Sequence, residues 1–479
     1  MPASDDHRPW LVILFCAVFG ARKARGKTGR GLFHGELLRL IEEKKFAQAR
    51  ERLNECNEVD IAEWLDDFEK DSRALVIFRL LPKEMAADVF SYLSPESQQH
   101  IVEGLTDREL AGVIEDLFLD DTVDFLEEMP ASIVKRVIAT ADTQTRAQLN
   151  QLLMYPPDSA GSLMTPELME LDGDWTVARA LAAVRRQCED KASISWLYVT
   201  DGRRHLVGVV DLRSVLAAPD AQRVDALMEP DVKAVRTHDD QADVAAMFRK
   251  YDLLAMPVVD NERRLVGVIT IDDVVDVLEE ETTEDIYKMA AMTPAERGYM
   301  ETDVLTLAKN RVLWLVLLMI SATFTGFIIA RFDAALAANV LLASFIPMLM
   351  DTSGNAGSQA SVSVIRGITL GEIRFSDLPR VMWKELRVSL LAGMGVAAVN
   401  FLRVWLMYGD PVMALVVSLT LVFAIMAAKL VGCALPLLAA RVGLDPALMA
   451  GPLITTLADP VALLLFFNIA MLLMPGLSG

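Results

Sequence analysis

The chain has 479 residues, 53% of them hydrophobic, and a net charge of −20 at pH 7, a large acidic excess for so apolar a sequence. The charge is unevenly divided: residues 31–300 carry 29 Lys and Arg against 54 Asp and Glu, whereas residues 301–479 carry 11 against 10. An acidic soluble portion is therefore joined to a nearly neutral apolar portion, and the acidity argues against nucleic-acid binding, which requires a basic face.

Residues 1–30 read as an extension outside the folded domains. They contain 6 basic and 2 acidic residues, and their apolar stretch at 10–20 has 11 residues, whereas a bilayer-spanning helix needs about 20. The basic cluster that follows this stretch would resist translocation, which argues against a signal peptide. We expect the extension to be disordered.

Residues 31–155 are predicted to form an α-helical, superhelical N-terminal domain built from repeated hairpins. Short turns that contain Pro82, Pro95 and Pro130 separate the helical segments. The domain also carries acids that could face a metal ion on another element, and the sequence leaves open which of them do so. These acids are Glu63, Asp66, Asp67, Asp120, Asp121 and Asp124.

Residues 156–271 contain an internal duplication. The stretch SLMTPEL at 162–168 recurs as ALMEPDV at 226–232, and LVGVVDL at 206–212 recurs as LVGVITI at 265–271. Each copy is predicted to contain an amphipathic helix, two short strands around a tight turn, and a second helix. The duplication resembles a tandem pair of CBS domains, an α/β regulatory unit that binds small ligands.

Residues 272–300 are predicted to begin with an acidic linker (plug) helix that leads into the apolar portion. On a helical wheel, Asp273, Asp276, Glu280 and Glu284 fall within about 80° of one another. Like charges at this spacing destabilise a helix, and divalent cations that bridge them to another acidic surface would relieve the repulsion. An ordinary solvated acidic face is the alternative. The position of this helix makes it a candidate gate lever.

Residues 301–479 contain five apolar stretches near bilayer length, which predict an α-helical transmembrane domain with five spans. Lys and Arg gather before the first span, between the second and third, and between the fourth and fifth. This bias predicts a multi-pass protein of a bacterial-type inner membrane, with a cytoplasmic N-terminus and an external C-terminus. The expected spans are Val312–Ala330, Ala334–Met350, Val388–Tyr408, Val412–Leu430 and Ala447–Met474.

Asp459 is the most informative residue within these spans. If its helix starts near Asp445, it lies 14 residues in, or about 21 Å along the axis, where a carboxylate costs at least about 2.5 kcal/mol. A cation would offset this cost, with oxygens from Thr455 and from a carbonyl freed by Pro460 as further ligands. A protonated Asp bonded to a neighbouring helix is the alternative. Asp445, followed by Pro446, reads as a helix N-cap at the cytoplasmic mouth.

A run of small and polar residues at 347–359 follows the second predicted span. This composition permits close helix approach, and it permits exposed backbone carbonyls around a cavity. We therefore expect the run to line a pore, with Gly354, Asn355, Gly357 and Gln359 as the lining residues.

The order and spacing of these features resemble the MgtE family of magnesium channels and transporters over about residues 31–479. The resemblance rests on the helical domain that ends in YPPDSAGSLMT at 155–165, the CBS pair, GNAGSQ at 354–359, and the segment from DP to the LAD sequence at 445–459. It implies a homodimer with five spans per subunit and a pore at the two-fold axis.

The resemblance also implies roles for individual residues. Asp459 would hold hydrated Mg²⁺ in the pore, and Asp445 would lie near its cytoplasmic mouth. Some family members bind ATP in the CBS pair, so ATP is a further candidate ligand. The implied ligands of regulatory Mg²⁺ are Asp273, Asp276, Glu281, Glu284 and Asp285.

The predicted function is therefore a Mg²⁺-selective channel or transporter that imports magnesium and closes when Mg²⁺ neutralises the acidic cytoplasmic domains. Pro460, Ala462 and Ser358 depart from the family pattern and could change pore width or ion choice. Alternatives are a transporter of Co²⁺ or Mn²⁺, a Na⁺-coupled exchanger, and a membrane-anchored CBS sensor without transport. An enzyme is not predicted, because the sequence shows no catalytic triad, no P-loop and only 5 His.

Overall fold

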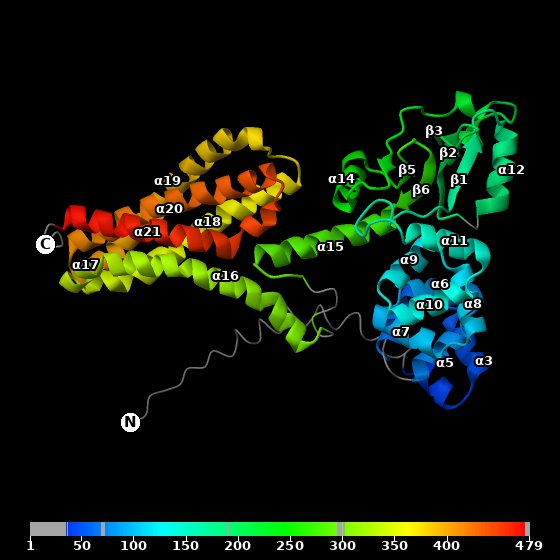
Figure 1. Ribbon diagram of the computed structural model, residues 1–479, viewed down its shortest axis with the longest axis horizontal. Coiled ribbons are helices and arrows are strands. Elements are labelled where there is room, and N and C mark those ends of the chain that lie inside the picture. The colour runs from blue at the N-terminus through cyan, green and yellow to red at the C-terminus, as the bar shows by residue number, and fades with distance from the viewer. Residues whose placement is uncertain are drawn as a thin grey trace. The chain divides into compact units, whose positions relative to one another are not determined.

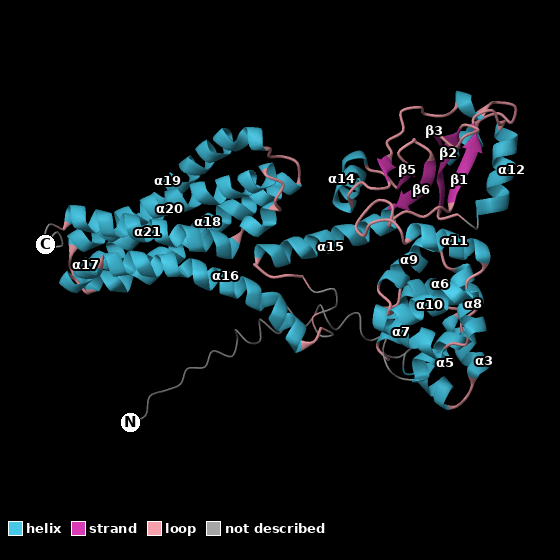
Figure 2. Cartoon of the chain, in the orientation of Figure 1, coloured by secondary structure: helices cyan, strands magenta, loops and turns pink. Residues whose placement is uncertain are grey.

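The computed structural model describes residues 35, 37–68, 72–188, 191–294, 299 and 302–474, so the predicted extension at 1–30 lies outside the described residues. The chain divides into two compact units, Met1–Val277 and Leu278–Gly479. Within the described ranges, strands occur in the first unit, and the second consists of helices and loops (Figures 1 and 2).

The N-terminal domain is helical, as predicted. Pro82 precedes α6, Pro95 is the first residue of α7 and Pro130 precedes α10, positions that suit proline because the first turn of a helix has no partner for its N–H groups. Its helices are α3 (Phe46–Leu53), α4 (Glu58–Asp66), α5 (Ser72–Leu80), α6 (Lys83–Ser91), α7 (Pro95–Gly104), α8 (Asp107–Asp116), α9 (Leu119–Glu127), α10 (Ala131–Thr140) and α11 (Thr143–Leu152).

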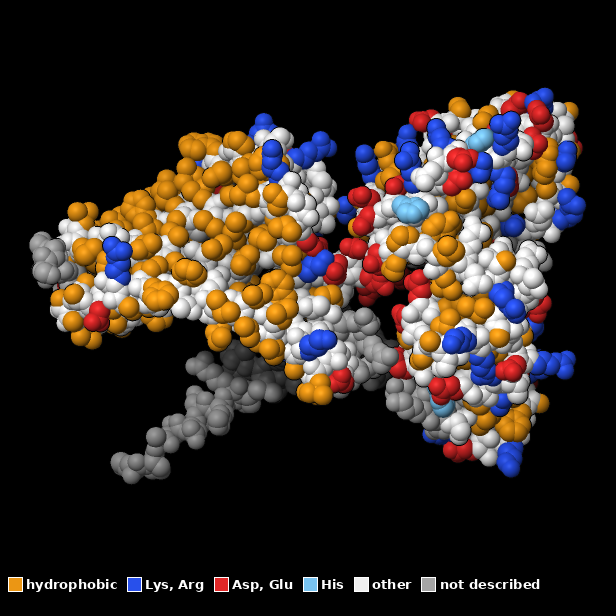
Figure 3. All heavy atoms as spheres, viewed as in Figure 1, with side chains coloured by type: hydrophobic (Ala, Val, Ile, Leu, Met, Phe, Trp, Pro, Cys, Tyr) orange, Lys and Arg blue, Asp and Glu red, His pale blue; other side chains and the backbone are white. Residues whose placement is uncertain are grey.

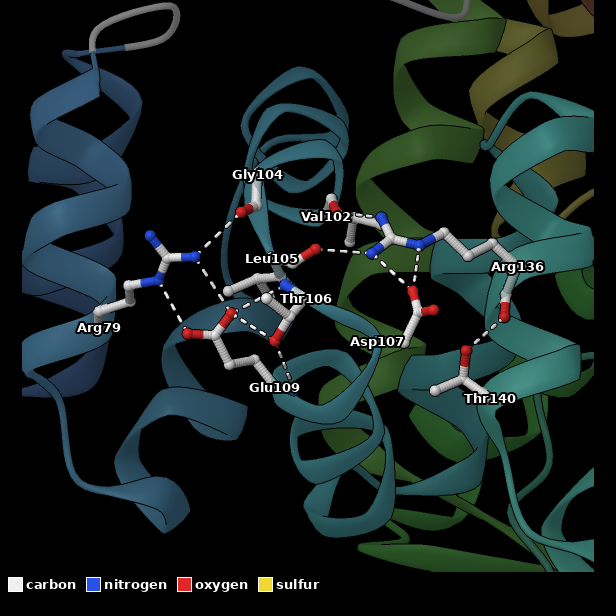
Figure 4. A network of polar contacts seen from close by, with 9 residues as sticks. All are labelled: Arg79, Val102, Gly104, Leu105, Thr106, Asp107, Glu109, Arg136 and Thr140. Atoms are coloured by element: carbon white, nitrogen blue, oxygen red, sulfur yellow. Dashed lines mark hydrogen bonds and ion pairs between the residues drawn. The ribbon is translucent and has the colours of Figure 1, made fainter.

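A clamp between α5 and α8 stabilises this domain (Figure 4). The Arg79 guanidinium donates to both carboxylate oxygens of Glu109, at 2.9 and 3.1 Å, and to the carbonyl of Gly104. Glu109 also accepts from the backbone and hydroxyl of Thr106, which completes a capping box at the start of α8. Hydrogen bonds from Arg79, and then from Thr106, lower the pKa of Glu109 to about 2.

A second arginine clamps the end of α7 in a similar way (Figure 4). Arg136 of α10 donates to the carbonyls of Val102 and Leu105 and to the carboxylate of Asp107. The carbonyls at the end of α7 have no partner within the helix, so this guanidinium satisfies them.

Two three-stranded sheets follow, one for each copy of the duplication. In each sheet the first strand is parallel to the second, and the second is antiparallel to the third. The predicted sequence of helix, hairpin and helix is confirmed in both copies, whereas the leading strands β1 and β4 were not predicted. The elements are β1 (Leu168–Asp172), α12 (Val177–Gln187), β2 (Ser193–Thr200), β3 (Leu206–Asp211), α13 (Leu212–Ala217), η2 (Val224–Ala226), β4 (Val235–Arg236), α14 (Gln241–Tyr251), β5 (Ala255–Val259) and β6 (Leu265–Thr270).

The repeated motifs are explained by an exchange of contacts between the two copies. A Cβ atom on Gly267 of the second copy would lie 2.6 Å from the Met164 sulfur of the first copy, and one on Gly208 would lie 2.7 Å from the Met228 sulfur. Each LVGV glycine therefore leaves room for the methionine of the other copy. The backbone of Thr165 also pairs with that of Val268.

The acidic helix α15 (Ile271–Met289) crosses the boundary between the two units, and the rest of the second unit is a bundle of long helices. Hydrophobic side chains cover much of its visible surface (Figure 3). The elements are α16 (Val304–Arg331), α17 (Asp333–Ala338), α18 (Leu341–Thr369), η3 (Phe375–Asp377), α19 (Leu378–Tyr408), α20 (Pro411–Arg441), η4 (Pro446–Met449) and α21 (Gly451–Leu473).

Among the residues of this unit that the structure describes, four segments are long and apolar enough to cross a membrane: Val304–Arg331, Phe375–Tyr408, Pro411–Arg441 and Pro446–Leu473. Helix α18 packs against α20 and α21 in the same bundle but is not among the four. The fold therefore combines an N-terminal helical domain, a CBS-like pair and a helical region with apolar helices, and the count of five spans stays a prediction.

The second predicted span requires a correction. Instead of a single span at 334–350, the short helix α17 is followed by α18, which continues through Pro347 to Thr369. The run at 347–359 is therefore helical and has no exposed, irregular backbone. In an apolar environment, a continuous helix satisfies the backbone groups that an irregular segment would leave unpaired.

Candidate functional site

Asp459 lies within α21, on a turn that contacts α18. Its Oδ1 atom is buried and has no hydrogen-bond partner among the described residues, and Asp351 of α18 is a charged neighbour. The predicted start of its helix requires correction, because the turn η4 occupies Pro446–Met449 and α21 begins at Gly451. Asp459 is therefore eight residues into its helix, or about 12 Å along the axis. The apolar segment as a whole still begins at Pro446, next to Asp445.

Thr455 lies one turn before Asp459 on the same side of α21. Its hydroxyl donates to the Gly451 carbonyl at 3.0 Å, so its oxygen lone pairs remain available to accept. Its methyl group packs on Gly354, where an added Cβ would lie 2.9 Å away.

The surface of α18 carries a line of polar side chains, which we name the α18 polar stripe: Asp351, Asn355 and Gln359. The three residues are spaced four apart, so they lie on one side of the helix, and all three are exposed. The predicted pore-lining residues Asn355 and Gln359 belong to this stripe, and Asp351 was not singled out from the sequence. Its signal was available, because a spacing of i, i+4, i+8 is visible once the run is recognised as helical.

The two glycines predicted to line the pore face the opposite way. Gly354 and Gly357 are buried against α20 and α21. A Cβ on Gly357 would lie 2.6 Å from Ile454, and one on Gly432 of α20 would collide with the Gly357 carbonyl. These glycines bring helix backbones into close contact, which confirms the close helix approach predicted from the sequence. The pore-lining role of Gly354 and Gly357 stays a prediction.

A second group of charges, which we name the mouth cluster, joins the end of α15 to the start of η4. Its members are Glu284, Asp285, Lys288 and Asp445. Lys288 Nζ lies 2.8 Å from Glu284 Oε2 and 2.7 Å from Asp445 Oδ2. Asp445 also accepts from the backbone N–H of Ala447 at 2.8 Å, so the predicted N-cap is confirmed.

The charges of the mouth cluster affect one another. Burial, and then the nearby carboxylate of Asp445, raise the pKa of Asp285. Burial alone would lower the pKa of Lys288, but hydrogen bonds to Asp445 and Glu284 outweigh it and raise that pKa. The ammonium is therefore charged at neutral pH. Lys288 was not identified from the sequence, although it stands four residues after Glu284, the spacing of a helical ion pair.

A third group, which we name the buried acid cluster, consists of Asp120 and Asp121 on α9 and Asp273 at the start of α15. Asp273 Oδ2 accepts from the Thr270 hydroxyl at 2.7 Å, and Asp120 Oδ1 is buried and has no partner among the described residues. Burial, and then the charge of Asp273, raise the pKa of Asp121 to about 7 and that of Asp120 well above its usual range. Burial outweighs the Thr270 hydrogen bond and raises the pKa of Asp273 to about 6.

The predicted regulatory ligands therefore fall into two places. Asp273 and Asp276 belong to the first unit, whereas Glu284 and Asp285 belong to the mouth cluster of the second. Glu281 lies between them on α15 and is partly exposed. Within the described ranges, no three His, Cys, Asp or Glu side chains converge closely enough to hold a metal ion on their own.

The chain matches three protein-family profiles that together cover most of its length. Residues 346–469 match a divalent cation transporter profile, MgtE; residues 56–158 match the MgtE intracellular N domain; and residues 160–220 and 224–280 match the CBS domain. The matches follow the order of domains described above.

Two similar relatives are named magnesium transporter MgtE. The chain is 38% identical to that of Thermus thermophilus, over 91% of this chain and 98% of the relative. It is 29% identical to that of Bacillus subtilis, over 90% and 95%. Among solved structures, the cytosolic domain of the Mg²⁺ channel MgtE in complex with ATP aligns with 38% identity and a TM-score of 0.49, covering 51% of this chain and 99% of that structure.

Proposed function

This chain belongs to the MgtE family of divalent cation transporters, and on that premise we propose that it is a Mg²⁺-selective channel that imports magnesium across the cytoplasmic membrane. It is not an enzyme. The observation that carries the proposal is the carboxylate of Asp459, which lies in the membrane-spanning segment Pro446–Leu473. One of its oxygens is buried and has no hydrogen-bond partner among the described residues. A carboxylate so placed is costly unless a cation compensates it.

The oxygens around Asp459 suit Mg²⁺. This ion prefers oxygen ligands in an octahedral arrangement and sheds its water reluctantly, so a single carboxylate that contacts a hydrated ion is sufficient on each subunit. The Thr455 hydroxyl lies one turn away and can accept from an ion-bound water. Pro460 has no N–H, which frees the Thr456 carbonyl upstream as another acceptor.

The α18 polar stripe supports a homodimer with the pore at its two-fold axis. Exposed carboxylate and amide groups on a membrane-domain helix require a polar partner, because hydrocarbon offers none. A second copy related by two-fold symmetry would place the same stripe opposite itself. The space between two such stripes would be lined by polar oxygens, as an ion pathway requires.

We assign the closing signal to Mg²⁺ at the cytoplasmic acids. In the buried acid cluster, the carboxylates of Asp120, Asp121 and Asp273 destabilise one another when charged, in keeping with their raised pKa values. A divalent cation would remove this repulsion and favour the arrangement that brings α9 and α15 together. Because α15 continues into the mouth cluster, cation binding at the buried acid cluster would also affect the entrance to the proposed pore.

The test is Mg²⁺ flux into proteoliposomes that contain a Mg²⁺-sensitive dye. Asp459→Ala is expected to reduce uptake to the level of empty liposomes while the protein still inserts. The matched control is Asp333→Ala, which removes an exposed carboxylate from α17 of the same unit and should leave uptake unchanged. Normal Mg²⁺ uptake by Asp459→Ala would contradict the assignment of Asp459 to the ion pathway.

The same assay separates the alternatives. Co²⁺ or Mn²⁺ that competes with Mg²⁺ at equal concentration would indicate a broader divalent transporter, and a dependence of uptake on a Na⁺ gradient would indicate an exchanger. A membrane-anchored CBS sensor would show no flux at all. ATP at the CBS pair stays a prediction, which equilibrium dialysis of the purified protein with labelled ATP would test.

A further inference from the structure

The ammonium of Lys288 lies between two carboxylates that come from different elements. Glu284 belongs to the last turns of α15, and Asp445 caps η4 in front of the helix that carries Asp459. Lys288 therefore bridges the linker helix to the segment that leads into the proposed pore. Its side chain keeps about a quarter of its surface exposed, 23%, so an ion in solution can reach it.

The backbones on either side of this bridge are also in contact. A Cβ on Gly451, the first residue of α21, would lie 3.3 Å from the carbonyl oxygen of Met289, the last residue of α15. Since Lys288 directly precedes Met289, the ion pairs and this backbone contact form one junction. The ammonium therefore lies where two segments of the second unit meet, and it pairs with a carboxylate from each of them.

The charges at this junction do not balance. Glu284 and Asp445 pair with the one ammonium, and Asp285 adds a third carboxylate beside them. Among the described residues these three carboxylates do not converge closely enough to hold a metal ion in the present arrangement, with the ammonium in place. Carboxylate oxygens are hard ligands that bind Mg²⁺ well. A divalent cation that enters this group must share or replace the ammonium, because the oxygens that accept from Lys288 are the same oxygens that would bind the metal.

We propose that Lys288 is a tethered counter-ion that competes with divalent cations for the carboxylates of the mouth cluster and thereby sets the Mg²⁺ concentration at which the channel closes. At low Mg²⁺ the ammonium occupies the carboxylates, and at high Mg²⁺ the metal displaces it. Lys288 is a positioning residue and does not contact the transported ion in the pore. This inference rests on the proposed function and adds a threshold to it.

The experiment measures flux against internal Mg²⁺ for the full-length protein in liposomes. Lys288→Met removes the charge and keeps the length of the side chain, and it is expected to lower the half-inhibitory Mg²⁺ concentration by about threefold to tenfold, since a competing charge is gone. Lys288→Arg keeps the charge and is expected to stay within about twofold of the parent protein. An unchanged or raised half-inhibitory concentration in Lys288→Met overturns the proposal.

A matched control removes a lysine with a similar partner elsewhere. Lys233 lies 3.1 Å from Asp231 on the exposed surface of the first unit, and Lys233→Met should leave the inhibition curve in place. A shift of equal size in Lys233→Met would show that net charge, and not the mouth cluster, sets the threshold, and it would also overturn the proposal.

A second measurement does not depend on transport. Protection of the linker from protease, followed against Mg²⁺, should reach its midpoint at a lower concentration in Lys288→Met than in the parent protein. The two failures are distinguishable. If the parent protein carries no Mg²⁺ flux, the proposed function is wrong. If internal Mg²⁺ inhibits the parent protein and Lys288→Met has the same half-inhibitory Mg²⁺ concentration, only this inference is wrong.

Discussion

Glu109 shows how a partly exposed carboxylate can stabilise a helical hairpin. It accepts from the Arg79 guanidinium and closes the capping box with Thr106. These hydrogen bonds hold its pKa at about 2, below the ordinary value of 4.5. A carboxylate whose folded-state pKa is lowered stabilises the fold above its unfolded pKa and loses that contribution as the pH falls toward the folded one.

We therefore expect Glu109→Gln to lower the free energy of unfolding by about 1 kcal/mol at pH 7, a value kept small because both partners are partly exposed to solvent. The difference from the parent protein should shrink as the pH falls from about 4.5 toward 2. Thermal unfolding of the full-length protein in detergent measures both effects. Glu115→Gln is the control, since Glu115 is 72% exposed and lies 3.4 Å from Lys83; equal losses in both variants would contradict the clamp.

Among the elements, α18 and α20 approach closely because both carry glycine at their contact. A Cβ on Gly432 would collide with the carbonyl of Gly357, and a Cβ on Gly357 would lie 3.0 Å from the Ala428 carbonyl. Small residues at such positions let membrane helices gain van der Waals contact along their backbones. Residues of α21 pack on the same glycines of α18, with Thr455 against Gly354 and Ile454 against Gly357.

Gly432→Ala should therefore push α18 and α20 apart, with a loss of about 1–3 kcal/mol in stability and reduced Mg²⁺ flux. Gly395→Ala is the control, because a Cβ at Gly395 of α19 would meet nothing within 4 Å and alanine is the better helix former. Thermal unfolding in detergent and the liposome assay measure the two outcomes. Equal stability of the two variants would show that the close approach is not required.

The acidic helix α15 supplies a further prediction at this scale. Replacing Asp273 and Asp276 together by alanine removes the carboxylates that α15 presents at its start, so Mg²⁺ should have less to neutralise there. We expect weaker inhibition of flux by internal Mg²⁺ and weaker Mg²⁺-dependent protection from protease. Unchanged Mg²⁺-dependent protection from protease in this double variant would show that these carboxylates of α15 do not sense Mg²⁺.

The elements that the sequence predicts correctly are those whose signals are local. The LVGV repeats and the acidic turns before them predict the hairpins, because strand periodicity and turn residues act over a few positions. At residues 347–359 the close helix approach predicted from the small residues is confirmed, but the exposed backbone carbonyls are not, because the run is helical. The packing that makes a helix favourable there comes from α20 and α21, which a local signal does not reveal. The pairing of Lys288 with Asp445 was equally out of reach, since it joins residues far apart in the sequence.

For the whole molecule, the testable expectation is the assembly of two copies around the α18 polar stripe. In a variant whose four cysteines are replaced by serine, Asn355→Cys should cross-link between copies in membranes treated with a short bifunctional maleimide. Val399→Cys is the control, because Val399 is 72% exposed on α19 and is expected to face lipid. Cross-linking of both variants to the same extent would place the subunit contact elsewhere.

The exchange of contacts in the CBS-like pair has a consequence for the order in which the chain acquires its structure during synthesis. Met164 and Thr165 leave the ribosome 103 residues before their partners Gly267 and Val268. At about 5–20 residues per second, the first copy waits roughly 5–20 s with its methionine uncovered. During that interval the nascent chain exposes apolar surface. A chaperone that binds exposed hydrophobic segments would therefore bind the chain at this stage of synthesis.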